Sequence, residues 1–157
     1  MELINKIETL LRPWPIAFVR ISIGIVFLWF GVLKFFPNTS PAETMAQRTM
    51  DKLTLGLISS EMNYLILAII ETVFGLFLIG NIFKKMIVPL TLGHLIMTFS
   101  PILLFPSEVF TGILIPTLLG QYIIKNLVLF SALLLINQRF CYSNSDEKIC
   151  ISQPSLD

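Results

Sequence analysis

The sequence predicts an all-α integral membrane protein: a four-helix transmembrane bundle with an N-terminal interfacial helix and an outer amphipathic helix between spans one and two. Hydrophobic residues make up 55% of the 157 residues and charged residues only 13%, well below the ~25% typical of soluble domains. The mean hydropathy is +0.81, and four apolar runs approach the ~20 residues that cross a bilayer. The formal net charge of +1 gives no reason to expect nucleic-acid binding.

The first predicted element is a short amphipathic helix over residues 1–15, MELINKIETLLRPWP. Its leucine and isoleucine residues share one helix face, and Trp14 lies where interfacial aromatic residues gather. We expect this segment to be retained, because the apolar run that follows exceeds the apolar region of a typical signal peptide.

The four predicted spans form one bundle over residues 16–137, at 16–36, 62–80, 86–105 and 115–136. Pro116 suits the first turn of the fourth span, where a missing N–H does no harm. The alternative, buried helices of a soluble protein, would require polar helix faces that these segments lack.

A capping box is predicted directly after span one. Ser40-Pro41-Ala42-Glu43 has the S-x-x-E spacing, with Ser40 as N-cap and Glu43 at N3. An apolar stripe follows on an otherwise polar helix, which is too polar to span the bilayer and should lie flat on the outer surface as a lid. The stripe comprises Ala42, Met45, Ala46, Thr49, Met50, Leu53 and Leu57.

The distribution of lysine and arginine predicts the orientation of the chain. Cytoplasmic connections carry the excess of these residues, so both termini should lie in the cytoplasm, with the 37–61 connection and the 106–115 turn outside. One side has Lys6, Arg12, Lys84, Lys85, Arg139 and Lys148, and the other has Arg48 and Lys52.

The predicted polar cytoplasmic tail covers residues 138–157 and contains Cys141 and Cys150. On the reducing side of the membrane disulfides rarely persist, and this spacing matches no common metal site. Two incidental thiols are favoured; a disulfide would require the inverted topology.

Five ionisable residues lie within the predicted spans: Arg20, Lys34, Glu71, His94 and Lys125. Each falls on a stripe of polar and small residues at helical spacing, and small residues allow close approach of membrane helices. We therefore expect these stripes to face the bundle interior. They are Arg20-Gly24-Phe27-Gly31-Lys34, Tyr64-Ala68-Glu71-Gly75, Leu90-His94-Thr98-Pro101 and Gln121-Lys125-Val128-Ala132.

A rise of about 1.5 Å per residue places Glu71, His94 and Lys125 in one middle layer. Lys34 lies nearer the outer rim and should point inward, toward Glu71 and Lys125. The candidate intramembrane polar site is Lys34, Glu71, His94, Gln121 and Lys125, with Arg20, Tyr64 and Glu43 as secondary members.

A structural interpretation of the same residues stays open. A Glu71–Lys125 pair could neutralise two costly charges, Arg20 and Lys34 could extend to the interfaces, and His94 could be a hydrogen-bonded core residue. A single histidine cannot build a usual haem or metal site, so we expect no metal.

Three segments carry a family resemblance: RISIGIVFLWFGVLKFFPNTSPAE (20–43), AIIETVFGLFLIG (68–80) and PTLLGQYIIKNLVLFSALLLI (116–136). They resemble bacterial DoxX-type small membrane proteins, including the YkgB-like branch. The resemblance implies a four-helix protein of the bacterial cytoplasmic (inner) membrane. Some members are redox subunits, YkgB-like members are linked to oxidative-chlorine stress, and animal relatives act as receptor assembly chaperones.

An accessory or non-catalytic role is favoured over a self-sufficient enzyme, because the sequence lacks a complete nucleophile, metal or nucleotide motif. Three such functions remain open. The first is a quinone-linked or accessory redox subunit, with Lys34 or Lys125 and aromatic residues around the headgroup. The second is a small solute or proton transporter. The third is a non-enzymatic assembly or structural subunit, which contacts a protein partner or a second copy through residues 45–57. The aromatic residues considered for the quinone are Phe27, Trp29, Phe30 and Tyr122.

Overall fold

A computed structural model describes the backbone of residues 14–36, 39–40 and 42–142, and side chains as far as residue 138 within these ranges. The helices are α2 (Trp14–Leu33), α3 (Glu43–Leu53), α4 (Ser60–Gly80), α5 (Lys84–Met97), α6 (Ser100–Leu104), α7 (Pro106–Val109) and α8 (Leu118–Tyr142). The strands are β1 (Phe110–Gly112) and β2 (Ile115–Pro116). Four segments are long and apolar enough to cross a membrane: Trp14–Leu33, Ser60–Gly80, Lys84–Leu104 and Leu118–Gln138.

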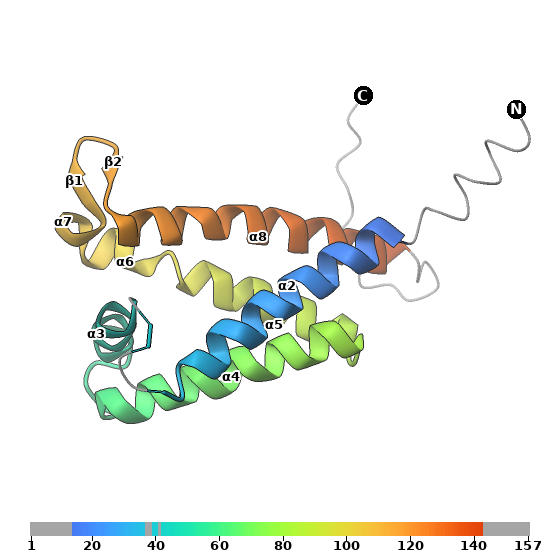
Figure 1. Ribbon diagram of the computed structural model, residues 1–157, viewed down its shortest axis with the longest axis horizontal. Coiled ribbons are helices and arrows are strands. Elements are labelled where there is room, and N and C mark those ends of the chain that lie inside the picture. Colours follow the sequence, from blue (N-terminus) through green and yellow to red (C-terminus); the bar gives the residue numbers. More distant parts are fainter. Residues whose placement is uncertain (1–13, 37–38, 41, 143–157) are drawn as a thin grey trace, which may run out of the picture.

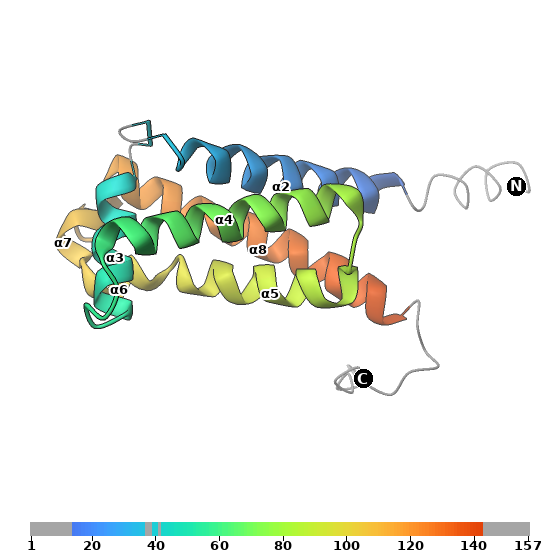
Figure 2. The ribbon, with the colours of Figure 1, turned by 90° about the horizontal axis from the view of Figure 1, so that it is seen from below.

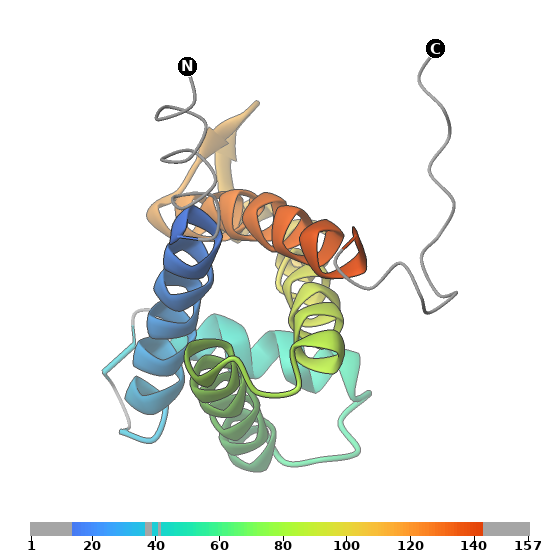
Figure 3. The ribbon, with the colours of Figure 1, turned by 90° about the vertical axis from the view of Figure 1, so that its right-hand side faces the viewer.

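The four long segments lie along one common axis, and each runs antiparallel to the one before it in the chain (Figure 1). Seen along that axis they form a ring in the order α2, α4, α5, α8 (Figure 3). The described chain therefore begins and finishes at the same end of the bundle. Helix α3 lies across the opposite end, nearly perpendicular to the bundle (Figure 2). We call this opposite end the α3 end.

Glycine residues let α2 and α4 pack closely. A Cβ atom added to Gly31 would lie 2.6 Å from the amide nitrogen of Thr72, and one added to Gly75 would lie 2.6 Å from the Cα of Leu28. Both distances are below any normal contact, so only glycine fits there. The predicted inward stripes of spans one and two are confirmed, because every member is buried except Lys34, which is partly buried.

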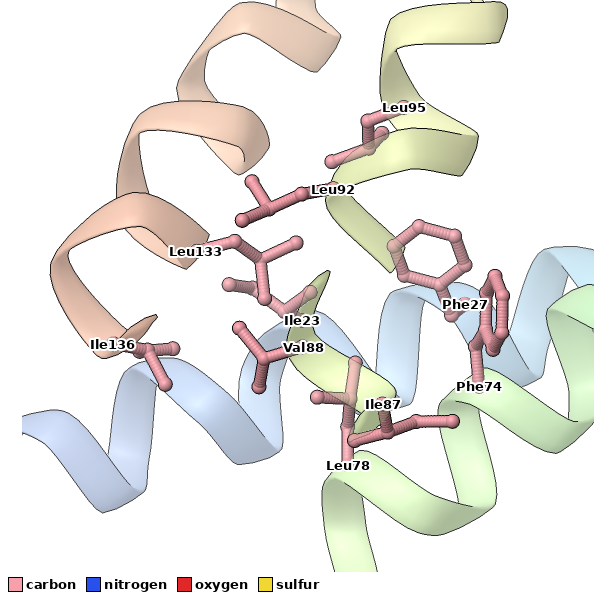
Figure 4. Close-up of a cluster of buried hydrophobic side chains, with 10 residues drawn as sticks. All are labelled: Ile23, Phe27, Phe74, Leu78, Ile87, Val88, Leu92, Leu95, Leu133 and Ile136. Atoms are coloured by element: carbon pink, nitrogen blue, oxygen red, sulfur yellow. The ribbon is translucent and has the colours of Figure 1, made fainter. Parts of the chain in front are cut away.

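Apolar side chains from all four long helices meet in the core (Figure 4). Burial of such side chains stabilises contacts between the helices through close packing, since lipid tails are as apolar as leucine. The cluster comprises Ile23, Phe27, Phe74, Leu78, Ile87, Val88, Leu92, Leu95, Leu133 and Ile136.

The third predicted span is not one continuous helix. Helix α5 ends at Met97, and α6 starts at Ser100. Pro101 has no N–H to donate to the carbonyl of Met97, so the regular hydrogen-bond ladder cannot continue there.

The fourth span starts later than predicted, and the all-α prediction is wrong in one detail. Ile115 and Pro116 form β2, antiparallel to β1, with Gly112 opposite Ile115. Helix α8 begins at Leu118 and its backbone continues to Tyr142, so the predicted tail from 138 begins as helix.

Helix α3 confirms an amphipathic helix between spans one and two. It begins at Glu43 with Ala42 as N-cap, so Ser40 is not the N-cap as predicted. The amide of Glu43 donates to the main-chain carbonyl of Ser40 (3.1 Å), and the first helical bond joins Ala46 to Ala42 (2.9 Å).

Only the middle of the predicted α3 stripe faces the bundle. Met45 and Thr49 are buried, while Leu53 and Leu57 are exposed because the helix ends at Leu53. The predicted N-terminal helix, apart from Trp14 and Pro15 in α2, and residues 143–157 of the predicted tail with Cys150 lie outside the described residues.

Candidate functional site

Lys34 follows directly after the last residue of α2. Its amide still donates to the carbonyl of Gly31 (3.2 Å), which continues the helical turn. Side chains of a helix lean toward its N-terminus, so the Lys34 side chain returns along α2 into the bundle. There its Nζ pairs with Oε2 of Glu71, in the middle of α4.

Glu71 is the centre of the buried charge cluster, and it is only 8% exposed. One carboxylate oxygen pairs with Lys34, and the other lies 3.5 Å from Nε2 of His94 on α5. A cation, a carboxylate and an imidazole from three helices therefore meet at one place.

Aromatic rings surround the imidazole of His94. The ring centroids of Phe27 and Phe74 lie 5.8 and 5.6 Å from it, both edge-to-face, and 6.2 Å from each other. Edge-to-face geometry is the favourable arrangement for such rings. The two phenylalanine rings form an apolar surface on the His94 side of the charge cluster.

Close backbone packing permits this cluster. The space beside Gly31 is filled by the backbone of Glu71 and Thr72, so any side chain at position 31 would push α2 away from α4. In a bilayer an unpaired charge is costly, and pairing is the usual arrangement of intramembrane ionisable residues. Lys34 and Glu71 thus neutralise each other inside the bundle.

Gln121 and Lys125 do not join this cluster, and the predicted Glu71–Lys125 contact is wrong. Both are exposed, and the Lys125 ammonium lies 5.5 Å from the ring centroid of Tyr122 on the same helix. Lys125 is two residues beyond the buried Ile123, a rotation of about 200° around the helix.

The inward face of α8 could have been found from Gly120. A Cβ atom at Gly120 would overlap the carbonyl oxygen of Val109 in α7, so this glycine marks a close approach. Together with Ile123 it defines a buried face that the predicted Gln121–Lys125 stripe misses.

The secondary candidates lie apart from Glu71 or have other roles. The Arg20 guanidinium donates to the carbonyls of Leu78 and, at 3.1 Å, Ile79 near the end of α4. Such carbonyls lack helical partners, and a cation there is favourable. Tyr64 is buried in the second turn of α4, and Glu43 is the first residue of α3.

The aromatic residues considered for a quinone do not line one site. Phe27 faces the core, whereas Trp29, Phe30 and Tyr122 are exposed on the bundle surface. Positions 27 and 29 differ by about 200° around α2, so their rings point to opposite sides. The ring that the prediction missed is that of Phe74.

A second polar cluster at the α3 end was not predicted. The side-chain Nδ2 of Asn63 donates to Asp51 (3.2 Å), Thr54 (3.0 Å) and the carbonyl of Ile58 (3.2 Å), and the Ser60 hydroxyl donates to Asp51. These bonds fasten the end of α3 to the start of α4. In the sequence, an asparagine in the first turn of the second predicted span was the signal for this cluster.

Within the part of the chain that the structure describes, no three His, Cys, Asp or Glu side chains are grouped so that they could hold a metal ion. Comparisons with protein-family models, curated proteins and solved structures find no match to this chain.

Proposed function

We propose that this chain is a DoxX-type accessory subunit of a redox or stress-response system in the bacterial inner membrane, linked to quinone through Lys34, Glu71 and His94. One observation carries the proposal: a buried ammonium, carboxylate and imidazole meet beside two phenylalanine rings. Intramembrane ionisable residues are costly and commonly mark functional sites.

The residues of the cluster fit the chemistry of a quinone headgroup. The headgroup has two carbonyl oxygens, and Lys34 Nζ and a protonated ring nitrogen of His94 can each donate a hydrogen bond to one of them. The Glu71 carboxylate can hold a proton close to the same place, and Phe27 and Phe74 supply apolar contact for a flat ring. A bound quinone would supply the electron-carrying group.

Quinone analysis of the purified protein tests the proposal. The protein is isolated from bacterial membranes in mild detergent, and extracted quinone is quantified per chain. In His94→Phe, which keeps a flat ring but removes both nitrogens, we expect about tenfold less quinone, because one lost hydrogen bond of ~1.4 kcal/mol changes affinity tenfold.

Ser131→Ala serves as the control, because Ser131 is exposed on α8 and bonds within its own helix. Repeated absence of quinone from the unmodified protein, with no redox-active partner co-purifying, would refute the proposal.

A non-enzymatic assembly or structural subunit is the second candidate, and the β1–β2 hairpin favours it. Ile113 and Leu114 form the two-residue turn and are 95% and 85% exposed. Leu114 has φ 59°, a conformation for which such turns normally use glycine or asparagine. The apolar residues are therefore not explained by local turn geometry, and they suit contact with an apolar surface of another subunit.

A photo-reactive residue at position 113 tests this second candidate. Crosslinking in intact membranes should yield one defined protein adduct, with the same probe at the lipid-facing Leu135 as control. Adducts with lipid alone would count against a protein partner at the hairpin.

A further inference from the structure

Four buried polar atoms have no hydrogen-bond partner among the residues that the structure describes. They are the hydroxyl oxygens of Thr49, Tyr64 and Ser100, and Nε2 of His94, which lies 3.5 Å from a carboxylate oxygen of Glu71 but outside hydrogen-bond geometry. Thr49 and Tyr64 are only 6% and 5% exposed. Leaving one buried polar group unpaired costs about 1–3 kcal/mol, so this set requires an explanation.

Other hydroxyls in the same bundle are satisfied locally. Thr72, Thr91 and Ser131 each donate to the main-chain carbonyl one turn earlier, at 2.8, 2.7 and 2.9 Å. This bond is the usual arrangement for such residues inside a helix. The unpaired atoms are therefore a distinct set rather than a general property of the bundle.

Three of the unpaired atoms are on α3, α4 and α6, and α3 contacts both of the other helices; the fourth is in the charge cluster. Thr49 is on the buried face of α3, which lies across the end of the bundle (Figure 2). Tyr64 precedes Glu71 by seven residues on the same buried face of α4, about 10 Å along the helix. Ser100 follows His94 by six residues, past the break between α5 and α6.

This set continues toward the surface. Ser40, in the connection before α3, is a polar neighbour of Tyr64. Hydroxyls both donate and accept hydrogen bonds. A small molecule with the same two capacities can therefore link them one after another.

We propose that water enters the bundle beneath α3 and forms a hydrogen-bonded chain past Thr49, Tyr64 and Ser100 to His94. A buried water typically makes about three hydrogen bonds to polar groups that would otherwise be unpaired, and lipid offers no alternative partner. The chain gives the Lys34–Glu71–His94 cluster an aqueous route from the α3 end. It exists whether or not quinone binds.

Hydrogen–deuterium exchange at the C2 position of histidine tests this route, because His94 is the only histidine in the sequence. The full-length protein in lipid nanodiscs is transferred to deuterated buffer, and uptake is read by mass spectrometry across pH. The plateau rate reports access, separately from the pKa of the imidazole. We expect measurable exchange in the unmodified protein.

Ser100→Leu should slow this exchange severalfold, because an apolar side chain then occupies the route. Ser131→Leu is the matched control, since it makes the same change on the exposed side of α8 and should leave the rate unchanged. Thr49→Val removes one hydroxyl at nearly constant volume and should also slow exchange. If Ser100→Leu does not fold, Thr49→Val is the variant that tests the route.

Absence of deuterium at His94 in the unmodified protein would overturn the inference. Equal rates in Ser131→Leu and in the folded variants on the route would also overturn it. The two proposals can be refuted separately. Exchange at His94 without bound quinone would support the water route and refute the quinone proposal. Bound quinone with no exchange at His94 would support the quinone proposal and refute the water route.

Discussion

At the scale of single residues, the basic residues Arg20, in α2, and Lys34, directly after α2, have different partners. Lys34 neutralises Glu71, whereas Arg20 satisfies carbonyls near the end of α4. Both side chains are long and lie between α2 and α4. Their roles differ because the α4 groups that they reach differ: a carboxylate in mid-helix and main-chain carbonyls at the helix end.

We expect Lys34 and Glu71 to be energetically coupled. Lys34→Met or Glu71→Gln alone leaves one charge buried without its partner, which costs about 3–5 kcal/mol in comparable buried pairs. The double variant should lose clearly less than the sum of the two. Unfolding free energies in detergent micelles measure the cycle, and additivity within about 0.5 kcal/mol would make Lys34 only an interfacial anchor.

Arg20 should contribute to stability through its contact with α4. Arg20→Met leaves the carbonyls of Leu78 and Ile79 without this donor, and we expect a loss of about 1–3 kcal/mol. Lys125→Met also replaces a basic side chain by methionine, but at an exposed position on α8. It should not measurably change the unfolding free energy. Equal unfolding free energies for the two variants would contradict the proposed role of Arg20.

At the scale of elements, glycine contacts determine how α2 and α4 meet. Gly24 and Gly31 lie against the backbone of α4, and Gly75 lies against that of α2. The approach places Lys34 within reach of Glu71. The geometry of the charge cluster therefore depends on residues that carry no functional group.

Gly75→Ala should separate these helices and destabilise the bundle by about 1–3 kcal/mol, because its Cβ would overlap the backbone of Leu28. Gly93→Ala is the matched control: nothing described lies within 4 Å of the added Cβ, and alanine favours helix by up to ~1 kcal/mol. Thermal unfolding followed by circular dichroism compares them. A Gly75→Ala protein as stable as Gly93→Ala would disprove the close contact.

Helix α3 is attached to the α6–α7 region through charged and aromatic contacts. Nη1 of Arg48 donates to both carboxylate oxygens of Glu108 (2.7 and 2.9 Å), and Lys52 lies 4.1 Å from the ring centroid of Phe105. Exposed pairs of this kind are individually weak. Burial of Met45 against the bundle adds to the attachment.

At the scale of the whole molecule, an even number of long antiparallel segments places the first and last described residues at one end of the bundle. The excess of lysine and arginine on that side predicts that it faces the cytoplasm. The α3 end, with the hairpin and the start of the inferred water route, would then face outward.

Reporter fusions test this orientation. A green fluorescent protein joined to the C-terminus should fluoresce, and alkaline phosphatase at the same position should be inactive, because the first folds in the cytoplasm and the second only outside it. Alkaline phosphatase fused after residue 56, in the connection between α3 and α4, is the reciprocal control and should be active. The opposite pattern would invert the predicted topology.

The sequence by itself determined that the protein is mostly helical, that four segments are long and apolar enough to cross a membrane, and which faces of the first two point inward. Glycine and charged residues coincide there on one stripe, and both signals require the same orientation. For Arg20, Gly24, Gly31 and Glu71 the periodicity was therefore sufficient, because helical spacing relates residues on one element to each other.

Only the tertiary structure decided which charges meet. Helical periodicity states that Gln121 and Lys125 share a face, but the rotation of α8 about its own axis depends on its packing against α5, α7 and α2. That rotation turns Ile123 inward and leaves Lys125 exposed. The pairing of Glu71 with Lys34 and His94 depends on three helices at once, and no spacing within one helix encodes it.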